Sequence, residues 1–260
     1  MKYLSSKDNP YIKRIAKLKY KKYREKEKLF IIEGEKSVSE ALAKKDLLVS
    51  VLFDAGCEQY QDWPNKAPDI EWYQLQADLI DYLSDTENPQ GILAVAKIPD
   101  WDPAMITGEQ LLICLDGVSD PGNVGTIIRT GWAMGADGIL MTSDCADPYS
   151  PKVVRASMGG VLNIPIYMNY PLDHLISLKS KGYLIYGSSL KTENIIYGQD
   201  FTGAKIFVIG NESRGISNKS EKLCDMKIKI PINPQVDSLN AAIACAIILA
   251  EAWQQRYKSS

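Results

Sequence analysis

Residues 115–131, LDGVSDPGNVGTIIRTG, join an apolar run ending in a carboxylate to a Gly/Pro/Asn loop, and then to a helix-like pattern carrying one arginine. The GxxxxG spacing from Gly117 to Gly122 matches a phosphate-binding P-loop, but Asn123 and Val124 stand where that loop needs Lys and Ser/Thr. A dinucleotide-binding GxGxxG is absent as well. The stretch therefore predicts a strand, a loop and a helix that face a ligand without the phosphate loop of an NTPase or a dehydrogenase.

The sequence around this stretch alternates between apolar runs and helical patterns. Near-continuous apolar strands alternating with helices are typical of a parallel sheet covered on both faces. We therefore predict an α/β domain over residues 111–260. The expected strands are LLICLD (111–116), GILMT (138–142), IPIYM (164–168), YLIYGSS (183–189), KIFVIGN (205–211) and IKIPI (228–232).

The first part of the chain predicts a smaller α/β domain over residues 1–98. Its expected strands are LFIIEG (29–34), LVSVLF (48–53), IEWYQL (70–75) and GILAVAKI (91–98). Asn9-Pro10 has the form of an N-cap followed by proline, so a basic helix is expected from Pro10 to about Arg24. Residues 99–110 are polar and punctuated by Pro and Gly, which predicts a linker.

The net charge of −2 conceals a basic N-terminus, because residues 1–28 contain eleven Lys/Arg and three Asp/Glu. Tyrosines lie between these cations. One interpretation is a solvated helix face. The other is a surface that binds the phosphates of a nucleic acid and stacks on its bases. The candidate RNA-binding residues are Lys13, Arg14, Lys17, Lys21, Lys22 and Arg24.

Several classes of protein are disfavoured by composition. The chain has a single histidine, His174, so histidine-based metal or triad chemistry is close to excluded and we expect no metal site. The five cysteines are scattered without a CxxC pair, which favours free thiols in the cytoplasm. No apolar run reaches the roughly 18 residues of a membrane span, so no membrane partner is expected.

Two further motifs lie downstream of the opening stretch. KIFVIGNESRGIS (205–217) ends an apolar strand in Gly210-Asn211-Glu212, where glycine lets backbone groups face a ligand. IKIPINPQVDSLNAAIACAIILAEAW (228–253) begins a helix of small residues after Ser238, which is a plausible N-cap. Each motif alone also fits an ordinary turn or an ordinary cap.

Taken in this order, the motifs PGNVGTIIRTGWAMGADGI, VIGNESRGIS and IPINPQVDSLNAAIACAIILAEAW resemble the SpoU/TrmH family of SPOUT RNA 2′-O-ribose methyltransferases. The resemblance covers residues 111–254. It implies an α/β fold with a deep trefoil knot, a rare exception to unknotted topology. It also implies S-adenosyl-L-methionine as cofactor and a homodimer formed through the knotted domain. The N-terminal segment is similar to the substrate-binding domain of many members, an RNA-binding domain that folds like small ribosomal proteins.

The resemblance also assigns residues to the site. Those expected to act on the RNA are Arg129, Asn123, Glu212, Ser238 and Asn240. Those expected to bind the cofactor are Gly210, Ile230, Leu239, Asn211 and Ser188. Guanidinium groups stay protonated, so we expect Arg129 to stabilise charge on the acceptor oxygen in preference to abstracting its proton.

Family analogy favours ribosomal RNA over transfer RNA as the substrate. Two alternatives stay open at this point: a transfer RNA 2′-O-methyltransferase, and a non-catalytic RNA-binding or ribosome-assembly protein that retains the fold. The joint presence of Arg129, Glu212, Ser238 and Asn240 argues against the second.

Overall fold

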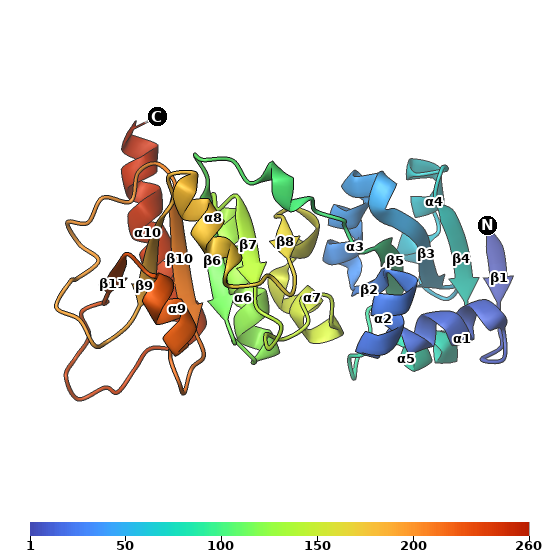
Figure 1. The fold of residues 1–260 in the computed structure, drawn as a ribbon. Coiled ribbons are helices and arrows are strands. Elements are labelled where there is room, and N and C mark those ends of the chain that lie inside the picture. The colour runs from blue at the N-terminus through green and yellow to red at the C-terminus, as the bar shows by residue number, and fades with distance from the viewer. Residues whose placement is uncertain (260) are drawn as a thin grey trace. The chain divides into compact units, whose positions relative to one another are not determined.

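The computed structural model describes the backbone of residues 1–259 (Figure 1) and the side chains as far as Tyr257. The chain divides into two compact units. Unit 1 consists of Met1–Asp100 and Asp147–Leu162, and unit 2 consists of Trp101–Ala146 and Asn163–Ser260. The segment 147–162, expected in the C-terminal domain, thus belongs to unit 1, and most of the expected linker belongs to unit 2. The reason is packing, since the ring of Tyr149 lies 5.0 Å from that of Phe30.

Unit 2 alternates strands and helices as expected, although its last strand covers residues 226–228 and not the predicted 228–232. Its strands are β6 (Leu111–Asp116), β7 (Gly138–Met141), β8 (Ile166–Tyr167), β9 (Leu184–Ser188), β10 (Lys205–Gly210) and β11 (Met226–Ile228). Its helices are the short 3₁₀ turn η3 (Pro103–Met105), α6 (Pro121–Ala133), α8 (His174–Ser180), α9 (Asn218–Leu223) and α10 (Ala241–Ser259). None of the described helices has the length and hydropathy needed to cross a membrane.

The six strands of unit 2 form one sheet in the order β11-β9-β10-β6-β7-β8, and every pairing in it is parallel. The prediction of a parallel sheet is confirmed. Side chains of a strand alternate between its faces. On one face of β6, Leu112 packs in a core with Leu175 of α8. On the other face, a methyl group added to Gly131 of α6 would lie 2.8 Å from Ile113. Helices therefore cover both faces.

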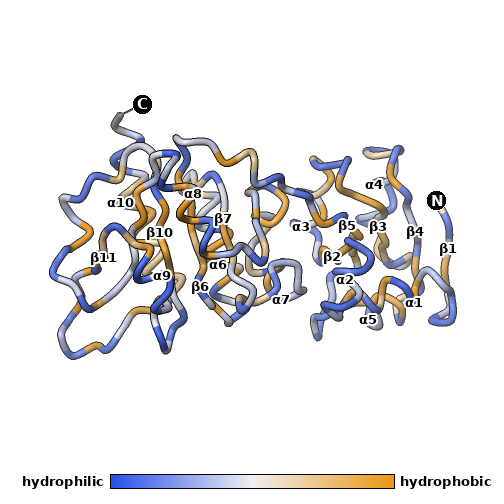
Figure 2. The backbone as a smooth tube through the Cα atoms, in the orientation of Figure 1, coloured by the Kyte–Doolittle hydropathy of each residue, from blue (hydrophilic) through white to orange (hydrophobic). Residues whose placement is uncertain are grey.

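Unit 1 has a mixed sheet in the order β1-β4-β3-β5-β2. Its strands are β1 (Lys2–Leu4), β2 (Leu29–Glu33), β3 (Leu48–Asp54), β4 (Glu71–Leu75) and β5 (Ile92–Lys97). Its helices are α1 (Pro10–Lys17), α2 (Lys21–Glu27), α3 (Glu35–Ala41), η1 (Leu42–Leu47), η2 (Glu58–Tyr60), α4 (Trp63–Lys66), α5 (Ala77–Leu83), α7 (Pro151–Ser157) and η4 (Gly160–Leu162). In both units, apolar residues follow the strands (Figure 2). The expected strands are present, and β1 was not predicted.

The basic segment forms two helices where one was expected. α1 ends at Lys17 and α2 begins at Lys21, so the carbonyls of Leu18 and Lys19 lack helical partners. The Nη1 atom of Arg24 donates to both carbonyls at 2.7 Å. The buried guanidinium of Arg24 thus satisfies the carbonyls left unpaired between the two helices. The helical pattern of the sequence does not reveal this break.

Candidate functional site

The first motif forms the end of β6, a loop and the beginning of α6. Asp120 is the N-cap of α6, and its carboxylate accepts a hydrogen bond from the amide of Asn123 at 2.8 Å. Pro121 occupies the first helical turn, where its missing N–H costs nothing. The cap therefore fixes Asn123 in the first turn of α6, beyond the carboxyl end of a central strand.

The second motif forms a tight turn after β10. The amide of Asn211 donates to the carbonyl of Gly215 at 3.0 Å, and the amide of Gly215 donates back to the carbonyl of Asn211 at 2.8 Å. Gly215 has φ +70°, a conformation that favours glycine. The side-chain amide of Asn211 also donates to the carbonyl of Gly117 at 3.0 Å. The turn is thereby fastened to the loop of the first motif.

Asp116, the last residue of β6, is a buried carboxylate that the sequence analysis did not select. Its Oδ2 atom accepts from the amide of Ser217 at 2.6 Å, which holds the segment after the turn against β6. The signal that could have found it is the carboxylate at the end of the apolar run LLICLD.

A hydrogen-bond chain joins all three motifs. The side-chain amide of Asn123 donates to Oε1 of Glu212, and the side-chain amide of Asn240 donates to Oδ1 of Asn123 at 2.8 Å. Oδ1 of Asn240 in turn accepts from the amide of Ala242 at 2.9 Å, at the start of α10. Residues 117 positions apart are therefore held in one network, and Asn240, not Ser238, bonds to the first turn of α10.

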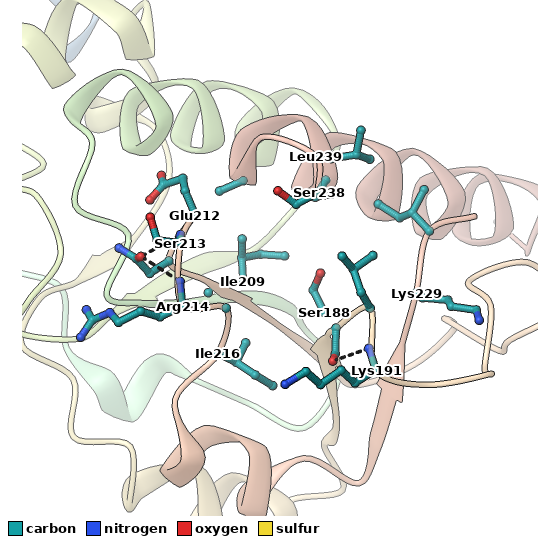
Figure 3. A pocket seen from close by; sticks show the side chains of 18 of the residues that line it. Ser188, Lys191, Ile209, Glu212, Ser213, Arg214, Ile216, Lys229, Ser238 and Leu239 are labelled. Atoms are coloured by element: carbon teal, nitrogen blue, oxygen red, sulfur yellow. Dashed lines mark hydrogen bonds between the residues drawn. The ribbon is translucent and has the colours of Figure 1, made fainter. Parts of the chain in front are cut away.

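A cavity of about 490 Å³ opens beside this network. Figure 3 shows Glu212 at one side of it, Ser188 at another and Ser238 with Leu239 above. All five residues expected to bind the cofactor line the cavity, namely Ser188, Gly210, Asn211, Ile230 and Leu239. Glu212 and Ser238 line it as well. It lies where β9 and β10 end, the usual ligand position in parallel α/β sheets.

The cavity has the size and the chemistry that S-adenosylmethionine requires. Its volume falls within the roughly 300–1,000 Å³ typical of small-molecule sites. Apolar side chains suited to an adenine ring include Ile209 and Leu239. The backbone groups of Ile230 and Leu239 make no hydrogen bond with any residue in the described part of the chain, so they are available to a ligand. A methyl group at Gly210 would overlap the backbone of Gly215, so only glycine permits this close approach.

Arg129 does not line the cavity. It is exposed on α6, six residues beyond Asn123, which is about 9 Å along a helix axis. Its guanidinium makes no hydrogen bond or ion pair with a described residue. The helical spacing that groups Trp132 with Val124 and Ile128 predicts a buried side chain at position 132, yet Trp132 is 43% exposed. That prediction was wrong, since Trp132 lies among the exposed positions of α6 together with Thr126 and Arg129.

The structure changes the basic surface expected in unit 1. Arg24 is 3% exposed and forms an ion pair with Asp147 at 2.6 Å, so it cannot present its charge to RNA and that prediction was wrong. The other candidates stay at the surface. Lys13 pairs with Asp8, Arg14 with Glu27 and Lys21 with Glu25, Lys17 lies over the ring of Tyr23, and Lys22 is exposed. Three of these five cations thus have an acidic neighbour in this structure.

Burial makes the thiols of Cys114 and Cys224 unfavourable as nucleophiles. All five cysteines are free. Burial raises the pKa of Cys114 well above its ordinary value and raises the pKa of Cys224 to about 12. Both thiols therefore favour the protonated, poorly nucleophilic form at neutral pH.

Fold and cavity together define a parallel α/β domain that binds a small molecule at the carboxyl ends of its strands. Residues 110–250 match the model of the SpoU rRNA Methylase family, and residues 9–94 match that of the MRM3-like substrate binding domain. The chain belongs to the SpoU rRNA methylase family, which confirms the family indicated by its motifs.

Relatives and solved structures agree with this assignment over nearly the whole chain. The 23S rRNA (guanosine(2553)-2′-O)-methyltransferase RlmP of Bacillus subtilis is 32% identical over 96% of this chain and 98% of its own length. The AdoMet-bound rRNA methyltransferase of Sinorhizobium meliloti superposes with a TM-score of 0.88 at 29% identity, covering 97% of each chain. AviRb of Streptomyces viridochromogenes, solved with AdoMet, has a TM-score of 0.86 at 27% identity, covering 96% of this chain and 98% of its own.

Proposed function

We propose that this protein transfers a methyl group from S-adenosylmethionine to a ribose 2′-hydroxyl of ribosomal RNA. The observation that carries the proposal is the network of Glu212, Asn123 and Asn240 at the edge of the 490 Å³ cavity. It joins polar groups from all three motifs and reaches the cavity through Glu212, which supports a role for the network in holding an acceptor hydroxyl against a bound ligand. Relatives named as rRNA methyltransferases, matched from end to end, support ribosomal RNA as the substrate.

The acceptor must be held and polarised, because a ribose hydroxyl is a weak nucleophile at neutral pH. When bound, S-adenosylmethionine supplies an electrophilic methyl group on its sulfonium. Oε1 of Glu212 is occupied by Asn123, while Oε2 makes no hydrogen bond with a described residue. We assign Oε2 the task of accepting a hydrogen bond from the acceptor hydroxyl. Ser238, on the same cavity, can hydrogen-bond the ribose. Fixing the oxygen in line with the methyl contributes much of the rate in such a displacement.

Arg129 keeps its predicted role in this proposal, which is to stabilise negative charge near the acceptor. Its guanidinium makes no hydrogen bond or ion pair with a described residue, so it is available to bind a phosphate. Trp132 lies one turn further on the exposed side of α6. A dimer formed through this surface would bring Arg129 close to the second protomer, which suits its distance from the cavity of its own chain.

A homodimer through unit 2 is supported by the composition of α10. Residues 241–250, AAIACAIILA, contain no polar or charged side chain, and Ile243 is 50% exposed within them. α10 packs against α6, on which Trp132 is also exposed. A helix that is apolar on all sides is normally covered, and exposed apolar surface of this kind marks a protein interface. We also propose the family's deep knot for unit 2, and unit 1 as its RNA-binding platform.

The cytoplasm is the location we propose, since its reducing conditions keep free thiols such as these five from pairing.

The proposal is tested by calorimetry and by transfer of radiolabelled methyl groups. The protein should bind S-adenosylmethionine and label unmodified ribosomal RNA in vitro. Mapping 2′-O-methyl sites in cells with and without the gene should then identify one lost site. No binding at high micromolar cofactor would remove the enzymatic function and favour a non-catalytic RNA-binding protein. Labelling of transfer RNA in place of ribosomal RNA would overturn the proposed substrate.

A further inference from the structure

The turn after β10 presents three consecutive side chains beside the cavity. Glu212, Ser213 and Arg214 lie between Asn211 and Gly215, whose backbones bond to each other in both directions. Oδ1 of Asn211 accepts from the amides of Ser213 at 3.0 Å and Arg214 at 3.3 Å. The backbone that carries Arg214 is therefore fixed before any substrate arrives.

The side chain of Arg214 is directed outward from this rigid turn. Figure 3 shows Arg214 on the same side of the cavity as Glu212 and Ser213, with its guanidinium pointing away from the interior. The side chain is 75% exposed, and its ion pair is a long one of 4.0 Å to Asp144, itself 58% exposed. A pair of this kind contributes little to stability. The backbone of Arg214 is therefore fixed, whereas its guanidinium group makes only a weak ion pair with Asp144.

Arg214 also lies over the loop of the first motif. A methyl group at Gly117 would come 3.6 Å from its Nη2 atom. The first motif supplies Asn123, the partner of Glu212, so Arg214 is located on the acceptor side of the cavity. The phosphates that flank an acceptor ribose must lie at the mouth of the cavity once the 2′-hydroxyl is inside it.

The other cations that line the cavity are less suited to that task. Lys191 and Lys229 lie on the opposite side from Glu212 in Figure 3. The ammonium group of Lys229 is already paired with Glu193 at 3.0 Å. Arg129 is outside the lining of this chain's cavity altogether. Among the described residues that line the cavity, Arg214 is the one guanidinium group.

We propose that Arg214 binds an RNA phosphate next to the acceptor ribose and so positions the 2′-hydroxyl at Glu212. This rests on the proposed function and adds a residue to it that recognises the substrate. The planar guanidinium can bind phosphate through two parallel hydrogen bonds, which an ammonium cannot do. Asp144 competes for the same group with a weak, exposed contact that a phosphate readily replaces.

The test compares variants that should act in opposite directions. Arg214→Ala should weaken binding of in vitro transcribed ribosomal RNA about 10-fold, raise its KM and reduce the salt slope of binding by about 1. Arg214→Lys should recover part of this loss. Asp144→Asn should strengthen RNA binding about 2-fold, because it removes the competing charge. Lys219→Ala is the matched control, since Lys219 is an exposed cation paired with Asp173 outside the cavity lining, and its removal should change neither quantity.

Calorimetry with S-adenosylmethionine separates the possible failures. All four variants should bind the cofactor within 2-fold of the unchanged protein. Normal RNA affinity and an unchanged salt slope in Arg214→Ala would overturn the assignment. Equal loss of cofactor and RNA binding in that variant would also overturn it, because it would show that Arg214 only supports the turn. If the unchanged protein binds no cofactor and methylates no RNA, the proposed function fails instead.

Discussion

Gly210→Ala tests whether the close backbone approach at the end of β10 is what forms the cavity. A methyl group at this position would overlap three backbone atoms, the carbonyl carbon and oxygen of Gly215 and the amide nitrogen of Ile216. Real Cβ atoms essentially never come within 3.0 Å of a heavy atom outside their own residue and its two chain neighbours, and all three atoms lie closer than that. Backbone cannot rotate aside as a flexible side chain can, so either the turn or the strand must move.

The size of the effect follows from what the turn carries. Relieving the overlap needs a displacement on the order of 1 Å, and misplacement of reacting groups by that much costs about 100-fold in rate. Glu212 moves with the turn, so its bond to Asn123 is lost or stretched. We expect weaker binding of S-adenosylmethionine, a fall in kcat/KM of about 100-fold or more, and a stability loss of about 1–3 kcal/mol from overpacking.

The measurements are cofactor calorimetry, methyl transfer to ribosomal RNA and urea denaturation. Gly138→Ala is the matched control in the same sheet. Its nearest neighbours would be the side chains of Leu112 and Tyr167 at 3.2 Å, which can shift, and it lies outside the cavity lining. The control should keep cofactor affinity. The reasoning is refuted if Gly210→Ala binds cofactor and turns over like the unchanged protein.

Three further predictions concern stability and assembly. Arg24→Met leaves Asp147 without its buried partner and should destabilise unit 1 by about 3–5 kcal/mol in urea denaturation. Arg14→Met removes an exposed ion pair and should cost less than about 1 kcal/mol. Equal costs for the two variants would contradict the structural role of the buried pair. Burial raises the pKa of Tyr183 to about 12, so the unfolded chain ionises this tyrosine first and its contribution to stability should fall between pH 10 and 12 by roughly 1.4 kcal/mol per pH unit. Tyr183→Phe should therefore lose less stability over this range than the unchanged protein, by that amount. If the proposed dimer forms through this surface, Trp132→Glu should give a monomer in light scattering at micromolar protein where the unchanged protein gives a dimer, and an unchanged mass would place the interface elsewhere.

Much of unit 2 was readable from the sequence, for a local reason. Apolar runs such as LLICLD and KIFVIG indicate strands that are buried on both faces of a sheet, and such runs can be recognised in the sequence alone. The ordered motifs pointed to the family, and the five residues expected at the cofactor lie around one cavity. Their individual roles stay predictions, as do those of Glu212, Ser238 and Asn240.

Other features depend on partners distant in the chain, which periodicity does not encode. The sequence showed Arg24 as one more cation in a basic run, and only folding brought it to Asp147, 123 residues away. Trp132 continues the helical spacing of buried residues on α6, yet its side chain is 43% exposed in the folded chain. The sequence shows Arg214 only as a turn residue, whereas the hydrogen bond from Asn211 to Gly117 in the folded chain holds its turn against the first motif. Sequence alone determined which residues are chemically equipped for the site, because side-chain chemistry is local. Tertiary structure decided which charged side chains are accessible to a substrate, because their burial and ion pairing depend on residues distant in the chain.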